Sequence, residues 1–126
     1  MKHAVSTPSA PAALGPYSQG LEAGPFVFVS GQLPVDPATG DIPDGAAAQA
    51  ERAFANVRVI LEAAGLGLGN VVKTTVFLAD LADFAAVNEV YARSFSAPFP
   101  ARSCIQAAAL PRGARLEVEA IAVRPS

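Results

Sequence analysis

Two hydrophobic periods occur along this chain, and each predicts a type of secondary structure. Segments rich in β-branched and aromatic side chains, and segments in which apolar and polar residues alternate, predict strands. These segments span residues 26–30, 71–78, 101–108 and 115–123, with a shorter candidate at 18–22. Turn residues lie between them, as in the Asp-Pro-Ala-Thr-Gly run at 36–40.

Apolar residues at helical spacing predict two amphipathic helices. The first begins after Asp44, an expected N-cap, and ends at Gly65, a residue type that suits the position just past a helix. Asn56 falls on the polar side of this helix. The second helix begins near residues 80–83, where two aspartates can cap it, and runs to about Phe95.

The predicted order is β-β-α-β-α-β-β, an α+β fold in which two helices pack on one face of a single sheet. Residues 1–16 carry three prolines and are expected to form an extended lead-in without a helix. The uncovered face of the sheet still carries apolar residues. It needs a cover, for which another subunit is the simplest candidate.

Composition bounds the possible functions. A chain of 126 residues forms one domain, residues 1–126, and 52% hydrophobic against 16% charged residues favours self-association. The net charge of −2 and the lack of any Lys or Arg run argue against nucleic-acid binding. No apolar run approaches the about 20 residues that cross a bilayer. One cysteine and one histidine give no internal disulfide and no His/Cys metal cluster, and we expect a cytoplasmic protein.

Arg102 and Cys104 are the first candidates for chemistry. They lie two residues apart on an expected strand and therefore point to the same face. A guanidinium fixed on a strand is a rigid two-pronged clamp for a carboxylate, although a surface salt bridge is the commoner role. The only histidine, His3, lies in the lead-in, so we expect Cys104 to line a pocket rather than act as a nucleophile.

Glu117 and Glu119 alternate with apolar residues, so their carboxylates share one face of the last strand. They can be the solvated side of an ordinary strand, or one can be partly desolvated, with a raised pKa that suits proton transfer. The sequence does not indicate which of the two glutamates would carry the proton. With Arg102 they suggest proton-transfer chemistry on a small acidic substrate, in a cavity within one chain or between adjacent protomers.

Three further residues are candidates for the same site. Asn88 falls on the apolar side of the second helix, where its amide needs a partner from a loop, a ligand or the site's backbone. Tyr17 can be ordinary packing or a hydroxyl donor. Gly31 can allow a ligand to approach the backbone closely.

These segments together resemble the RidA family, the YjgF-type reactive intermediate deaminases. The resemblance covers nearly the whole chain. It rests on Gly-Pro-Tyr-Ser-Gln-Gly at 15–20, Val-Ser-Gly-Gln-Leu-Pro at 29–34, Asp-Pro-Ala-Thr-Gly at 36–40, Val-Lys-Thr-Thr-Val-Phe-Leu at 72–78, Pro-Ala-Arg-Ser-Cys at 100–104 and Glu-Val-Glu-Ala at 117–120.

The resemblance implies a chorismate-mutase-like fold and a homotrimer with a barrel-like centre and sites between subunits. It implies hydrolysis of reactive 2-enamine and 2-imine acids, such as 2-aminoacrylate and 2-aminocrotonate, to 2-keto acids and ammonia. Such a 2-iminobutanoate/2-iminopropanoate deaminase is expected to need no metal and no cofactor.

Residue by residue, the resemblance implies that Arg102 binds the substrate carboxylate and that Glu117 positions and activates water. Further pocket positions of the family match Tyr17, Gly31, Asn88 and Cys104. Two other functions stay open. One is an endoribonuclease or translation inhibitor, a label that some family members carry; the other is a non-catalytic keto-acid-binding or chaperone-like trimer.

Overall fold

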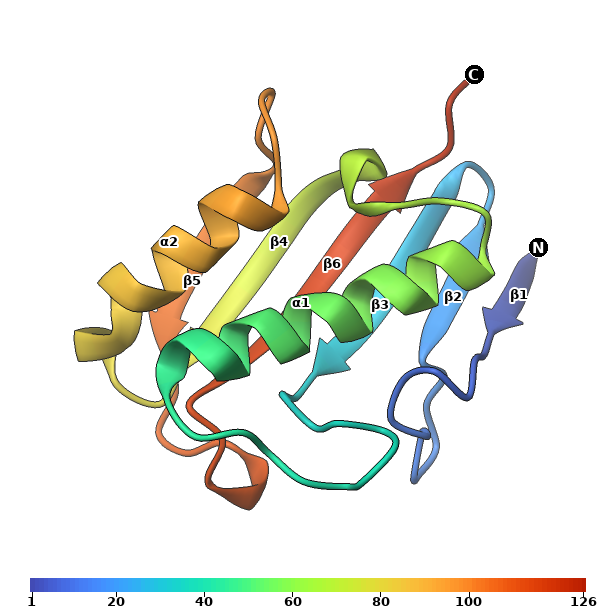
Figure 1. The fold of residues 1–126 in the computed structure, drawn as a ribbon. Helices are drawn as coiled ribbons and strands as arrows, with labels where there is room; N and C mark the ends of the chain where they lie inside the picture. The colour runs from blue at the N-terminus through green and yellow to red at the C-terminus, as the bar shows by residue number, and fades with distance from the viewer.

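The computed structural model describes residues 1–126 as a six-stranded sheet covered on one face by two helices (Figure 1). The strands are β1 (Lys2–Val5), β2 (Gly20–Ala23), β3 (Phe26–Gln32), β4 (Val71–Leu78), β5 (Ala101–Gln106) and β6 (Leu116–Val123). The helices are α1 (Ala46–Ala63) and α2 (Phe84–Ser94). Neither helix combines the length and apolar character that crossing a membrane requires.

The strands lie side by side in the order β1-β2-β3-β6-β4-β5. All neighbours are antiparallel except β4 and β5, which α2 connects in parallel. The last strand of the chain, β6, lies between β3 and β4 in the middle of the sheet (Figure 1). The expected α+β arrangement is confirmed, and the site-bearing strands β5 and β6 are separated by β4.

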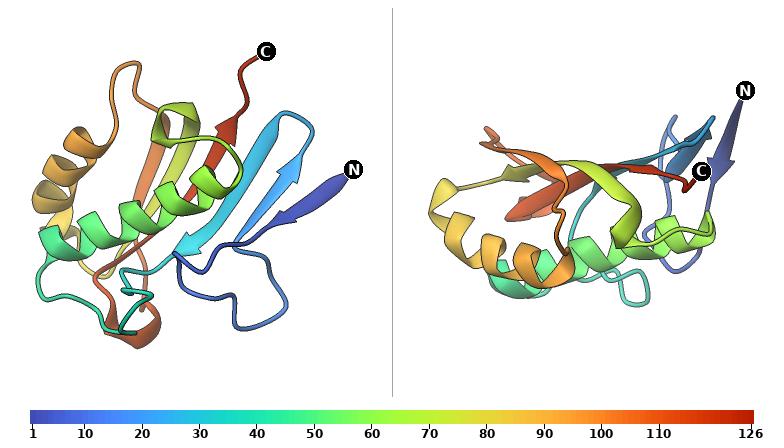
Figure 2. Two further views of the ribbon diagram at one scale, coloured as in Figure 1. Left: turned by 45° about the vertical axis from the view of Figure 1, so that its right-hand side comes forward. Right: turned by 90° about the horizontal axis from the view of Figure 1, so that it is seen from above.

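The two faces of the sheet differ in cover. Seen from above, both helices form a single layer on one side (Figure 2). Beneath them lie buried strand residues, which we call the helix-facing side: Val27, Val29, Thr74, Val76, Leu78, Leu116, Val118 and Ala120. The opposite side, which we call the open face, carries Leu21, Phe28, Lys73, Thr75, Phe77, Ile105, Glu117, Glu119 and Ile121. Phe28 and Ile105 are 41% and 50% exposed there, so the expected uncovered apolar surface is present.

Two local expectations need correction. The lead-in contains a strand that the predicted order omits, because β1 pairs along all four residues of β2; its Lys-His-Ala-Val sequence is too short and polar to show a strand pattern. Asp44 does not cap α1. The N-cap is Gly45, with φ of 90° and no side-chain hydrogen bond. Gly65 does end the helix as expected, with φ of 79°.

Asn56 was expected on the polar side of α1, yet it is fully buried. Its side-chain nitrogen donates to the main-chain oxygens of Leu33 and Val35, at 3.0 and 2.9 Å, and its oxygen accepts from Arg52 at 2.8 Å. A buried amide is favourable only when it is paired in this way. Asn56 therefore anchors the segment that follows β3 to α1.

We predict that Asn56→Ala lowers the free energy of unfolding by about 3 kcal/mol, because one buried and one partly buried carbonyl group lose their donor. Urea unfolding at one fixed protein concentration measures this change. The control is Glu62→Ala, which removes one partner of an exposed 3.9 Å ion pair with Arg58 and should change stability by less than about 0.5 kcal/mol. Equal losses for the two variants would contradict the role of Asn56.

Candidate functional site

Arg102 lies on β5, the strand at one edge of the sheet, and its side chain packs against α2. It is paired with Thr74 of β4, and paired residues point to the same side, so the guanidinium is on the helix-facing side. Its Nη1 donates to Asn88 Oδ1 at 2.8 Å. The partner of the Asn88 amide is therefore the Arg102 side chain, rather than a loop or the backbone of the site.

The Arg102 guanidinium keeps most of its hydrogen-bonding capacity. It takes part in none of the four ion pairs of the chain, and the bond to Asn88 is its only hydrogen bond. A guanidinium has five N–H donors in a fixed plane. A cavity of about 430 Å³ adjoins it, lined by Asn88, Tyr91, Ala92, Phe99, Pro100 and Arg102. This group is therefore held in place and free to bind an anion.

Cys104 points to the same side as Arg102, as expected, because it pairs with the buried Val76. Its side chain packs, partly buried, against the hydrophobic core. Burial raises the pKa of the Cys104 thiol, and the nearby charge of Arg102 offsets this only in part. A thiol with a raised pKa is a poor nucleophile at neutral pH.

Glu117 lies on the open face, with its carboxylate against the backbone of Gly31. A Cβ atom built on Gly31 would come within 2.1 Å of Glu117 Oε2, so any other residue at position 31 would displace this carboxylate from its present position. The pairing of β3 with β6 shifts register between Val29 and Gln32, and this irregularity contains Gly31. Burial raises the pKa of Glu117, and the neighbouring Glu119 carboxylate raises it further.

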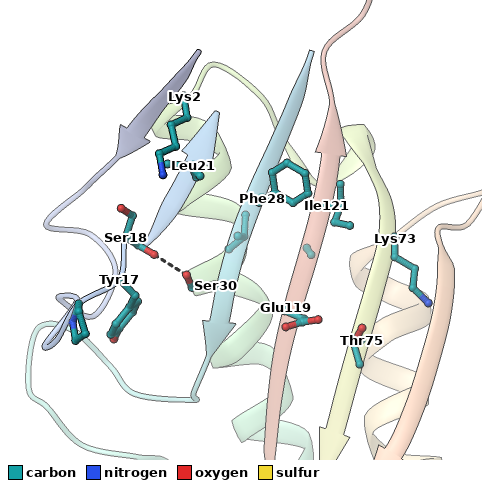
Figure 3. A pocket seen from close by; sticks show the side chains of 13 residues that line it. Lys2, Tyr17, Ser18, Leu21, Phe28, Ser30, Lys73, Thr75, Glu119 and Ile121 are labelled. Carbon is teal, nitrogen blue, oxygen red and sulfur yellow. Dashed lines mark hydrogen bonds between the residues drawn. The ribbon is translucent and has the colours of Figure 1, made fainter. Parts of the chain in front are cut away.

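Tyr17 lines a cavity of about 570 Å³ on the open face. Figure 3 shows this cavity, with Tyr17 and Ser18 on one side and Glu119, Thr75 and Lys73 on the other. Ser30 of β3 donates from its hydroxyl to the main-chain oxygen of Ser18, which ties the Tyr17 loop to the sheet. The buried Gln19 bonds to the main chain of the lead-in, at Thr7, Ala10 and Pro11.

The candidate residues thus form two groups on opposite faces of one chain. Arg102, Asn88 and Cys104 lie on the helix-facing side at the β5 edge, whereas Tyr17, Gly31 and Glu117 belong to the open face. Since β4 separates β5 from β6, two strand spacings, roughly 10 Å, also lie between them. Convergence of Arg102 and Glu117 within a single chain is therefore ruled out, and only convergence between protomers remains.

Some residues of these groups were not singled out from the sequence. Thr74 and Tyr91 bond to each other through their hydroxyl groups at 2.8 Å in a buried position behind Arg102. Thr74 carried a usable signal, since it occupies a position that alternates with the buried Val76 and Leu78. Lys73 and Ser30, which line the Tyr17 cavity, gave no signal beyond being polar residues within strands.

The chain is similar to known proteins over almost its whole length. Residues 7–124 match the family model described as endoribonuclease L-PSP. A relative from Escherichia coli named 2-iminobutanoate/2-iminopropanoate deaminase is 52% identical over 127 residues, covering 98% of this chain and 99% of its own. Two crystal structures are each 48% identical to this chain, with a TM-score of 0.93. RidA from an Antarctic Psychrobacter covers 96% of this chain and 98% of its own, and Escherichia coli TdcF with bound serine covers 98% and 99%.

The electrostatic effect of Glu119 on Glu117 can be tested directly. We predict that Glu119→Gln lowers the pKa of Glu117, because it removes a negative charge that disfavours ionisation of its neighbour. The Glu117 pKa should stay above its ordinary value, since burial, the larger cause, is unchanged. Titration of the carboxyl carbons by NMR measures the shift. Glu62→Gln, on the far side of α1, is the control, and an unchanged Glu117 pKa in Glu119→Gln would refute the coupling.

Proposed function

We propose that this chain, which belongs to the endoribonuclease L-PSP family together with its relatives RidA and YjgF, is a hydrolytic deaminase of 2-imino acids. Its substrates are the reactive 2-enamine and 2-imine acids, such as 2-aminoacrylate and 2-aminocrotonate. Its products are 2-keto acids and ammonia. The relative of 52% identity that bears the name 2-iminobutanoate/2-iminopropanoate deaminase supports this proposal.

The observation that carries the proposal is that the Arg102 guanidinium forms no ion pair and keeps most of its donors free. A 2-imino acid offers a carboxylate next to its reactive carbon, and a fixed guanidinium holds a carboxylate through two charge-assisted hydrogen bonds. In the name of the TdcF structure, the bound molecule is serine, which also carries a carboxylate next to a nitrogen-bearing carbon. Binding of this kind fixes the reacting carbon and removes part of the entropic cost of the reaction.

Hydrolysis then needs one water and two proton movements. The oxygen of water adds to the imine carbon as one water proton moves to nitrogen, which gives a carbinolamine. The proton of its hydroxyl group then moves to nitrogen as well, and the C–N bond breaks as ammonia leaves and the C=O bond forms. Glu117 is the proposed proton carrier, because its raised pKa brings its protonated and ionised forms closer to equal abundance at neutral pH. The missing side chain at Gly31 leaves the space that this carboxylate occupies.

We propose that the site forms between the subunits of a homotrimer, where the β5 edge of one protomer faces the open face of the next. Two features of the single chain support this arrangement. Arg102 and Glu117 lie on opposite sides of the sheet, so a second copy must supply one of them. The open face also carries exposed apolar side chains, including Phe28 and Ile105, that a neighbouring subunit would cover. Cys104, a free thiol, suits the reducing cytoplasm in which we propose the protein works.

The description of the family model names a second function, an endoribonuclease. RNA cleavage needs a pair of acid and base groups next to a bound phosphate. The only histidine, His3, lies on β1, three strand spacings or roughly 14 Å from Glu117 on β6, so it does not form such a pair within a chain. Cleavage of a labelled RNA that is lost in Arg102→Ala would favour this function over the deaminase.

We predict that Arg102→Ala lowers kcat/KM for 2-aminoacrylate by about 100-fold, because two hydrogen bonds to a charged carboxylate are lost. The substrate is generated in the assay by a serine or threonine dehydratase, and release of the 2-keto acid is followed. Arg58→Ala, on the exposed side of α1, is the control with expected wild-type activity. Gel filtration verifies that both variants assemble like the wild type. Unchanged turnover in an assembled Arg102→Ala variant would contradict the role of Arg102 as a carboxylate clamp. Binding of 2-ketobutyrate without any turnover by the wild type would instead indicate a non-catalytic binder.

Mixing two impaired variants tests whether the site lies between subunits. Glu117→Gln is expected to slow hydrolysis while 2-ketobutyrate still binds. When Arg102→Ala and Glu117→Gln chains are refolded together in equal amounts, an intact Arg102 meets an intact Glu117 at about a quarter of the interfaces. We predict that activity returns to about a quarter of the wild-type value. The matched control mixes Arg102→Ala with the double variant, where no intact pair can form, and a failure of the first mixture to exceed this control would contradict a shared site.

A further inference from the structure

Tyr91 of α2 lies directly beneath the Arg102 guanidinium. The Arg102 Cζ atom is 4.7 Å from the centroid of the Tyr91 ring and 5.4 Å from that of Phe84. Both distances fall within the about 6 Å over which a cation is attracted to the face of an aromatic ring. The planar guanidinium also stacks on such rings, which an ammonium group cannot do. Arg102 is therefore held by two rings as well as by its hydrogen bond to Asn88.

The Tyr91 ring is itself immobilised. It is 5% exposed, and its hydroxyl is hydrogen-bonded at 2.8 Å to the hydroxyl of Thr74, which is fully buried. Phe54 meets the ring edge-on at a centroid distance of 5.7 Å and an angle of 81°, and Phe95 lies 4.5 Å away. Since Thr74 is the β4 residue paired with Arg102, the ring is tied to the same point of the sheet from which the arginine extends.

These contacts leave a defined part of the guanidinium free. Nη1 is bonded to Asn88, whereas Nη2 and Nε have no hydrogen-bond partner. Two adjacent nitrogens of an arginine can hold both oxygens of one carboxylate. We propose that Tyr91 is a positioning residue, whose fixed ring sets the plane of Arg102 so that Nη2 and Nε present this edge to the substrate carboxylate. The inference rests on the proposed function, in which Arg102 binds that carboxylate.

The alternative is that Tyr91 serves only as part of the core, with Phe54 and Phe95. The two roles predict different effects on ligand affinity and on stability when the ring or the hydroxyl of Tyr91 is removed. A positioning ring affects ligand affinity through Arg102 alone, whereas a core residue affects stability and reaches affinity only through general loosening of the fold. The test therefore measures ligand affinity in two arginine backgrounds, with stability recorded separately.

The experiment uses 2-ketobutyrate as the probe, with its Kd measured by calorimetry and KM and kcat by the dehydratase-coupled assay. We expect Tyr91→Leu to raise Kd and KM about fivefold, with kcat changed less than twofold, because the clamp loses its aromatic support. Tyr91→Phe keeps the ring and loses the bond to Thr74, so it should lower the melting temperature and leave Kd within about twofold of the wild type. If Tyr91→Leu does not fold, Tyr91→Met, which fills the space with a flexible side chain, is measured in its place.

The decisive comparison is made in the Arg102→Lys background, where the planar group that stacks on the ring is gone. There Tyr91→Leu should change Kd less than twofold. A full fivefold loss in that background, or an unchanged Kd in the Arg102 background, would overturn the positioning role. The proposed function fails differently, since in that case Arg102→Lys would itself leave the Kd for 2-ketobutyrate unchanged.

Discussion

The sheet of this protein has two faces and only enough helix to cover one of them, and this constraint decides where every candidate functional group lies. Helices α1 and α2 bury the helix-facing side and leave the open face with Phe28 and Ile105 in solvent. Arg102 and Glu117 belong to different faces, so in the proposed function a single chain holds two half-sites rather than one complete site. Burial of apolar surface and completion of the site would then be achieved by the same association.

The two half-sites are built on different physical principles. The half-site at β5 presents one strong positive group, and its surroundings restrict that group's motion through two aromatic rings and an amide. The half-site on the open face tunes an acid, because burial and the charge of Glu119 both raise the pKa of Glu117. In the proposed function, one half would therefore supply orientation and charge, and the other a proton from an acid of raised pKa.

Much of the fold follows from local pattern. The β-branched and aromatic residues of β3 and β4, the alternation in β6, the helical spacing in α1 and α2, and the glycine at position 65 all predict what the structure contains. The strand β1 escapes this kind of inference because its four residues gain their structure from pairing with β2 rather than from their own pattern. Gly45 replaces Asp44 as the cap because the chain enters α1 with a positive φ, which glycine adopts without strain.

The chemistry was predictable as a set of residues and not as an arrangement. Arg102 with Cys104, and Glu117 with Glu119, share faces as the alternation predicts. Which face each pair occupies depends on strand order, and β6 lies between β3 and β4 for reasons that no local segment reveals. The same holds for Asn56 and Tyr91, whose partners are 21 and 17 residues away in the sequence.

The parallel pairing of β4 with β5 places a strict condition on chain length. Parallel neighbours need a crossover, and here the segment from α2 to residue 100 determines which β5 residue lies beside Thr74. A gain or loss of one residue in that segment, if it moved the register, would turn Arg102 to the open face and carry its neighbours with it. An insertion or deletion that the connection between α2 and β5 does not absorb would therefore cost the arginine its contacts with α2.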